Sequence, residues 1–414
     1  MFPLELFEAT VERLAAEGTL DDLRQCALAN KQLARLCQKQ IFHTVALVQK
    51  PVPRLVWPSD SEERVSLPPH PIERFANVVK QNPAIGTYVR ELEIESMRDY
   101  NVDDGFTVLG HLHQVHTFTL VFADGPRHVG IPKPWHTVSL GLQNSLFSFA
   151  HRNTITSLSL YHLSDLPPTF LQRFSHLQRL TVLGVHPDSS ICPATGESYI
   201  KLKELELLDE TVGFAEHFIL HPTAHTFDIS EISSLKVDFG INDDDHVVGR
   251  ILHLPVQLEE LDLHLSKNFS EWTCRGNVLS RLPPPSLNTL RRIALFIDTI
   301  DTPELPPYAE FVHELTRLQG QNVLEELRIT VMCQFDSDLN LDPIRWKELG
   351  DLLSSGFPCL RKLTLHVKVS IFDGPSPFEE AARKQVILEK ILDESFALID
   401  PNVELITSAR CREI

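Results

Sequence analysis

The sequence predicts an α/β fold in which a small helical module precedes a long stack of alternating strands and helices. Three observations support this prediction. A short apolar pattern typical of a half-buried strand recurs along the chain, the segments between its copies have helical spacing, and the first 41 residues lack the pattern. Repetition of one strand–helix unit favours a stack whose core grows with length over a set of separate globular domains.

The recurring pattern is an apolar residue, one variable residue and a second apolar residue, as in Leu205 and Leu207. Its first apolar positions are Leu92, Phe118, Leu158, Leu180, Leu205, Leu235, Leu261, Ile293, Leu327 and Leu363. Successive copies lie 22 to 40 residues apart, whereas leucine-rich repeats have a period of about 20–29 residues. We therefore expect a degenerate, long-period solenoid similar to leucine-rich repeats. The alternative, one compact α/β domain with similar strands, is disfavoured because no glycine-rich crossover loop occurs.

Between the expected strands, apolar residues recur at helical spacing in 142–150, 170–174, 306–318 and 346–353. Alternation of strand and helix implies a parallel sheet with helices on its outer side. In a curved stack, the strands line the concave side and the helices the convex side. An amphipathic helix at the C-terminal end, followed by a short strand, predicts a cap over about 376–414.

Composition limits the function classes. The chain has 414 residues, of which 43% are hydrophobic, so disorder throughout is excluded. No apolar run is long enough for a transmembrane helix, and no signal peptide is expected. The net charge of −18 disfavours nucleic acid as a partner. Seven scattered cysteines without a C-x-x-C pair indicate a reducing compartment, which is the cytoplasm or the nucleus.

The first 41 residues predict a module of three helices. Leu4, Phe7, Val11 and Leu14 share one face of the first helix, and Gly18 suits its end. Thr19 is the expected N-cap of the second helix, with Asp22 in its first turn. A strand over 42–48 and a proline-rich loop over 49–71 follow, and we assign 42–414 to the solenoid. So short a module cannot bury all its apolar faces, so the first repeats or a partner must cover the rest.

These residues carry a family resemblance. Phe2-Pro3-Leu4-Glu5-Leu6 is similar to the L-P-x-E-[IL] start of an F-box, and LRQCALANKQLARL (23–36) resembles the F-box segment L-x-x-C-x-L-V-C-[KR]-x-W. IFHTVALV and IERFANVVKQNPAIGTYVRELEIES (72–96) resemble the continuation in fungal, especially basidiomycete, F-box proteins with degenerate leucine-rich repeats. Asn30 and Leu33 depart from the family pattern, which favours Cys or Ser and then Trp.

The resemblance implies a substrate-recognition subunit of an SCF (Skp–cullin–F-box) ubiquitin ligase. The helical module would bind the Skp-family adaptor and, through it, a cullin–RING complex, while the solenoid would bind a protein substrate. The candidate adaptor-binding residues are Pro3, Leu4, Leu6, Phe7, Leu23, Leu28, Leu33 and Leu36. The alternative is a leucine-rich-repeat scaffold without a role in ubiquitination, in which these helices only cap the solenoid.

Alternation along the strands predicts which side chains face the concave surface. Val121, Tyr161, Leu183 and Leu208 would form an apolar row there, bordered by Glu204 and Glu206. Apolar rows of this kind tend to be interaction sites, so we expect the substrate to dock through an apolar segment with basic flanks. The alternative is that helical insertions or the long 118–158 connector cover the row.

Catalytic and cofactor chemistry find little support in the sequence. His111, His113 and His116 are close together, but a metal site usually adds a carboxylate or cysteine ligand. The motifs G-x-S-x-G, P-loop and H-E-x-x-H are absent. We therefore expect a protein that is not an enzyme and that holds no cofactor or metal and does not bind membranes.

Overall fold

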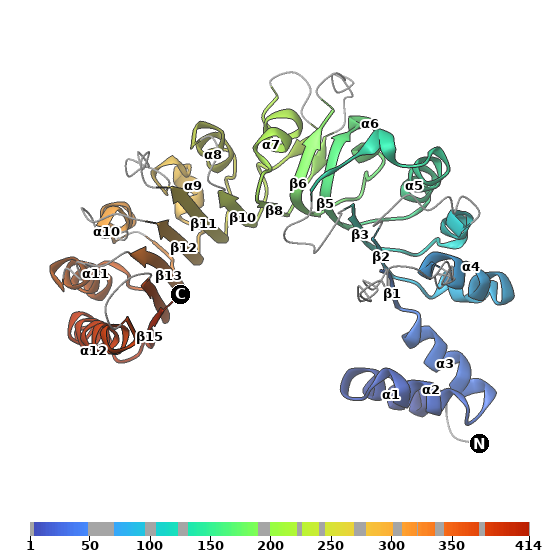
Figure 1. Ribbon diagram of the computed structural model, residues 1–414, viewed down its shortest axis with the longest axis horizontal. Coiled ribbons are helices and arrows are strands. Elements are labelled where there is room, and N and C mark those ends of the chain that lie inside the picture. Colours follow the sequence, from blue (N-terminus) through green and yellow to red (C-terminus); the bar gives the residue numbers. More distant parts are fainter. Residues whose placement is uncertain are drawn as a thin grey trace, which may run out of the picture. The chain divides into compact units, whose positions relative to one another are not determined.

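Figure 1 shows the computed structural model of the chain. It describes residues 4–48, 70–95, 105–122, 131–188, 199–221, 226–239, 245–268, 279–300, 309–320, 322–335, 343–371 and 377–413. The chain divides into two compact units. Described residues up to 188, apart from 181–183, belong to the first unit, and 181–183 with the residues from 199 onward belong to the second.

Three short helices open the first unit: α1 (Leu4–Glu17), α2 (Leu20–Ala27) and α3 (Lys31–Ile41). The expected cap of α2 is confirmed, because the Thr19 hydroxyl accepts from the Asp22 amide while the Asp22 carboxylate accepts from the Thr19 amide. Asn30 caps α3 in the same way by accepting from the amide of Leu33 at 2.9 Å. The N-terminal ends of α2 and α3 are thus each stabilised by a hydrogen bond to a local side chain.

The strands of the first unit follow chain order: β1 (Thr44–Leu47), β2 (Glu91–Glu95), β3 (Thr117–Val121), β5 (Ser157–Leu166) and β6 (Arg179–Pro187). Pairing from β1 through β5 is parallel, and the short β4 (Lys133–Pro134) also pairs with β5. Leu92, Phe118 and Leu158 occupy one register row and are buried. The apolar pattern therefore forms the core as expected.

Helices connect these strands along one side of the sheet (Figure 1). They are α4 (Pro71–Gln81), α5 (Leu140–Arg152) and the four-residue α6 (Pro168–Leu171), with the 3-10 turns η1 (Pro83–Thr87), η2 (Gly105–His111) and η3 (Trp135–Thr137). His70 precedes α4, and its Nδ1 accepts from the amide of Ile72. Residues 49–69 of the expected proline-rich loop lie outside the described residues.

The second unit repeats the arrangement with seven parallel strands in chain order. They are β8 (Glu204–Leu208), β10 (Ser234–Phe239), β11 (Glu260–Asn268), β12 (Arg292–Ile300), β13 (Glu326–Phe335), β14 (Lys362–Ile371) and β15 (Glu404–Glu413). One register row runs through Leu205, Leu235, Leu261, Ile293, Leu327, Leu363 and Leu405. This row is the leucine column that the sequence pattern encodes.

Helices again lie along one side of these strands (Figure 1). They are α7 (Val212–Phe218), α8 (Asp245–Leu252), α9 (Pro284–Leu287), α10 (Ala309–Thr316), α11 (Pro343–Gly356) and α12 (Pro377–Ser395), with the turn η5 (Leu279–Arg281). A separate short pair joins β7 (Ile200–Lys201) to β9 (Phe227–Asp228). All ten predicted repeat strands and the parallel α/β class are confirmed. Within the described residues, no helix is both long and apolar enough to cross a membrane.

Buried polar side chains connect successive repeats. The Asn153 amide donates to the carbonyls of Leu112 and Phe149 at 2.9 and 3.0 Å and accepts from the Val115 amide at 3.0 Å. In the second unit, Ser286 donates to the Pro255 carbonyl, and Asn322 donates to the Gly356 carbonyl. Each side chain satisfies backbone groups that would otherwise be buried without partners.

Candidate functional site

The N-terminal helices form a small core of their own. Val11, Leu23 and Cys37 are its buried members, and Leu14, Cys26, Ala27, Leu33, Leu36 and Ile41 pack against them half-buried. Burial, followed by the neighbouring Cys26, raises the pKa of the Cys37 thiol to about 11. Three of the predicted adaptor-binding residues, Leu23, Leu33 and Leu36, thus contribute to this core.

Other leucines of the same helices remain exposed. Leu6 on α1 is 54% exposed and Leu28, just after α2, is 80% exposed, while Phe7 is half-buried. Leu20, which the sequence analysis did not single out, is 47% exposed at the start of α2. Pro3 and the side chain of Leu4 lie outside the described residues. The module therefore combines a closed core with large apolar side chains in contact with solvent.

The predicted apolar row divides between the two units. Val121 and Tyr161 are register partners in the first unit, whereas Leu183 and Leu208 belong to the second. Val121 and Leu183 are buried, and Tyr161 and Leu208 are half-buried. The exposed apolar surface at these positions is therefore smaller than alternation alone predicts. Alternation could not reveal this, because at the end of β3 it breaks and both Leu120 and Val121 are buried.

Carboxylates gather around the predicted border residues in the second unit. We call Glu204, Glu206, Asp209, Asp238 and Asp262 the acidic group. Register pairs Glu206 with Lys236, and Lys236 with Asp262. The Glu206 carboxylate also accepts from the Thr181 hydroxyl at 3.4 Å. Three neighbouring strands, β8, β10 and β11, thus present four of these carboxylates, and Asp209 follows directly after β8.

Burial and mutual repulsion act on this acidic group. Burial raises the pKa of Asp209, and the carboxylates of Asp238 and Glu210 raise it further. Burial also raises the pKa of Asp262, although Lys236 and other cations oppose the rise. Groups of like charge in a desolvated setting are stabilised by any cation that approaches them. The acidic group is therefore suited to receive lysine or arginine side chains.

The strands on the far side of the acidic group neutralise their own charges. Arg292 pairs with Glu260, and Lys362 pairs with Glu404 at 3.2 Å. His264 Nδ1 lies 2.8 Å from the Asp238 carboxylate, and its ring packs edge-on against Phe296 with the centroids 4.1 Å apart. These contacts fix the position of Asp238. The carboxylates whose pKa is raised by burial, Asp209 and Asp262, therefore lie next to strands in which charges are already paired.

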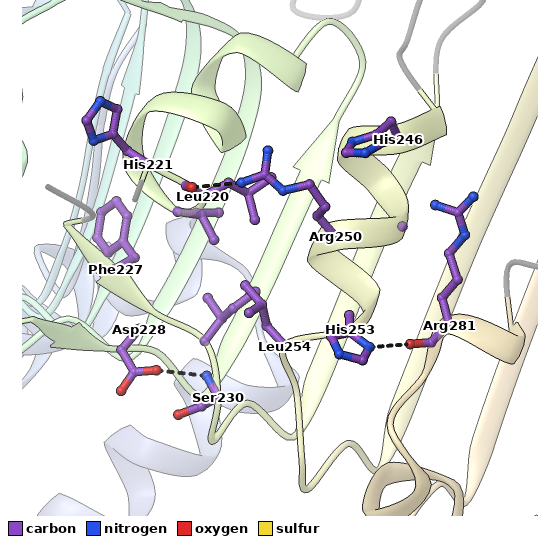
Figure 2. A pocket seen from close by; sticks show the side chains of 13 residues that line it. Leu220, His221, Phe227, Asp228, Ser230, His246, Arg250, His253, Leu254 and Arg281 are labelled. Atoms are coloured by element: carbon purple, nitrogen blue, oxygen red, sulfur yellow. Dashed lines mark hydrogen bonds between the residues drawn. The ribbon is translucent and has the colours of Figure 1, made fainter. Parts of the chain in front are cut away.

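A cavity of about 550 Å³ lies on the helix side of the second unit, around α8 (Figure 2). Arg250 reaches toward α7 and donates to the Leu220 carbonyl at 2.9 Å, and His253 Nδ1 lies 3.3 Å from the Arg281 carbonyl. Phe227 and Leu254 give the cavity an apolar wall. Sequence reasoning missed this cavity because its lining comes from three connecting segments that share no motif.

Gly249 lets a second arginine lie against α8. A Cβ at this position would overlap the Arg281 side chain where it lies, so the glycine accommodates that side chain against the helix. Arg250 and Arg281 thus place two cationic side chains beside an apolar wall. Within the described part of the chain, no group of three His, Cys, Asp or Glu side chains is arranged to hold a metal ion.

Comparison with known proteins adds no assignment. A scan of the chain against models of known protein families finds no match, and a search of curated proteins finds no significant match either.

Proposed function

We propose that this chain is the substrate-recognition subunit of an SCF-type ubiquitin ligase. Its N-terminal helices bind a Skp-family adaptor, and its repeats bind a protein substrate. The observation that supports the proposal is the exposure of Leu6, Leu20 and Leu28 on a three-helix module whose own core is already closed. Exposed apolar side chains on a soluble module favour docking to another protein.

Burial of these leucines would drive adaptor binding. Transfer of a fully exposed leucine side chain into an interface is worth about 1.5–3 kcal/mol. Among the described predicted adaptor-binding residues, Leu28 has the largest exposed fraction, at 80%, and Leu6 follows at 54%. Neither side chain belongs to the core of the module, so either can be changed without loss of the helices.

The test is co-purification of the full chain with a Skp-family adaptor, followed by titration. We expect Leu28→Asp and Leu6→Asp to weaken adaptor binding at least about tenfold while the thermal melting curve stays unchanged. Leu140→Asp is the matched control, because Leu140 is similarly exposed but lies on α5. Absence of adaptor binding by the unaltered chain, or equal effects of all three variants, would contradict the proposal.

The acidic group supports a basic segment as the part of the substrate that is recognised. Glu204 and Glu206 are half-buried, and burial penalises the charges of their neighbours Asp209 and Asp262. A lysine-rich or arginine-rich segment would offset that penalty. Substrate capture should therefore weaken on Glu206→Gln and with rising salt, whereas Glu231→Gln, which breaks an exposed pair with Lys201, should leave it unchanged.

A further inference from the structure

The last strand of the second unit has one unpaired edge. β15 pairs with β14, and no other described strand pairs with its opposite side. Leu405 shows the consequence, because it is 40% exposed while its register partner Leu363 is 1% exposed. Leu405 holds a core position of the repeat pattern, and within the described residues no second strand lies beside it. A ten-residue strand with open backbone groups is a template for pairing with another chain.

The backbone of β15 alternates between its two edges. The Glu404 amide donates to the Arg361 carbonyl at 2.8 Å, so even-numbered residues use their amides and carbonyls toward β14. Odd-numbered residues therefore present theirs to the open edge. The Cys411 amide already donates to the Gln385 side chain at 3.5 Å. The open stretch is thus 405–409, which is symmetric about Thr407.

Two opposite charges, Glu404 and Arg410, lie at equal distances on either side of Thr407. In an antiparallel pair centred on Thr407, Leu405 lies opposite Ala409 of the second copy, and both residues point their backbone groups at the partner. The same register places Glu404 of each copy opposite Arg410 of the other, which gives two such pairs. Arg410 is exposed and forms no ion pair with any described residue. The Glu404 carboxylate lies 3.2 Å from Lys362 on β14, yet its side chain is still 60% exposed, so a second cation can approach it. Opposite charges in directly facing positions stabilise strand pairing.

We propose that two copies of this chain associate through antiparallel pairing of their β15 strands about a two-fold axis at Thr407. The pairing joins the backbone groups of Leu405, Thr407 and Ala409 in both copies. It covers Leu405 and forms two Glu404–Arg410 ion pairs between the copies. An isologous contact of this kind closes on itself and yields a dimer, not a filament.

Charge reversal on the full chain tests the register. We expect the unaltered chain to show a concentration-dependent dimer in sedimentation velocity. Glu404→Arg or Arg410→Glu alone places like charges opposite each other and should raise the dissociation constant about tenfold. The double variant exchanges the two charges and should restore the dimer. Arg361→Glu is the control, because Arg361 is an exposed arginine that lies outside the strand.

A second variant tests the backbone pairing. Thr407→Pro removes an amide that faces the open edge and leaves the ladder to β14 intact, so it should abolish the dimer without lowering the melting temperature much. A chain that stays monomeric at every concentration would overturn the proposal. So would a dimer that none of the edge variants weakens, or single reversals that the double variant fails to rescue.

Discussion

Replacement of Asn153 by alanine should destabilise the first unit through backbone groups that lose their partner. The side chain of Asn153 accepts from the Val115 amide and donates to the Leu112 carbonyl. Both groups lie beside side chains that are fully buried, so water does not replace the lost amide. The Phe149 carbonyl keeps a partner, because the backbone amide of Asn153 also donates to it at 3.2 Å.

The expected loss follows from the two orphaned groups. A buried donor or acceptor without a partner costs about 1–3 kcal/mol, so Asn153→Ala, which leaves two such groups, should lower the free energy of unfolding of the first unit by about 2–6 kcal/mol. Urea denaturation followed by circular dichroism measures the change. Hydrogen exchange provides a local check, since the Val115 amide should exchange faster in the variant than in the unaltered chain.

A matched control lies on α5, the helix that Asn153 caps at its C-terminal end. Asn144 is an exposed residue of α5, so Asn144→Ala should change stability by no more than about 0.5 kcal/mol. Asn153→Asp keeps an acceptor for the Val115 amide and loses only the donor to the Leu112 carbonyl, so the Val115 amide should exchange as slowly as in the unaltered chain. Equal stabilities of Asn153→Ala and Asn144→Ala would refute the argument that Asn153 satisfies buried backbone groups.

Three further predictions concern backbone strain, acid and thiol reactivity. Gly184 has φ +57°, and a Cβ there would lie 2.8 Å from His162 Nδ1. Gly184→Ala should therefore lower the free energy of unfolding, measured by thermal denaturation, by about 2–3 kcal/mol. Gly320 also has a positive φ but open surroundings, so Gly320→Ala should lower it by only about 1 kcal/mol. The Thr19 amide and hydroxyl lower the pKa of Asp22 below its usual 3.8. The cap of α2 therefore contributes its full stability above pH 3.8 and loses it as the pH falls through the lowered pKa. NMR titration should show this low midpoint, and Asp22→Asn should remove the corresponding loss of stability in acid. Burial raises the pKa of the Cys411 thiol to about 11, so iodoacetamide at pH 8 should modify the exposed Cys359 well before Cys411. Mass spectrometry of the labelled peptides measures the order, and the reverse order would contradict the prediction.

The repeat strands could be predicted because burial of one face leaves a direct mark on the sequence. Leu205, Leu235 and Leu261 pair side by side, so each copy of the pattern had to place an apolar residue in the same register. The Thr19 cap was predictable for a similar reason, since the residues that form it lie only three positions apart. Features that depend on local periodicity or local hydrogen bonding can therefore be predicted from a single sequence.

Features that depend on distant segments were not predictable. His162 adopts φ +54°, and both His162 and Leu163 are buried, so the alternation of β5 breaks at this point. Asp209 joins the acidic group only because β10 brings Asp238 close to it. The exposure of Leu28 likewise follows from how three helices pack, which spacing alone cannot give. In each case a second segment decides the environment of the residue.

The strands of each unit follow one another in space in the order of the chain. Each repeat therefore contacts only its two neighbours, so duplication or loss of one repeat changes two interfaces and leaves the others as they were. A doubly wound sheet, whose strand order differs from the chain order, does not allow this. Connections of very unequal length can be accommodated for the same reason, because a longer link bulges outward without shifting the next strand. Gain or loss of one repeat would therefore lengthen or shorten the sheet by one strand and leave the pairing of the other strands unchanged.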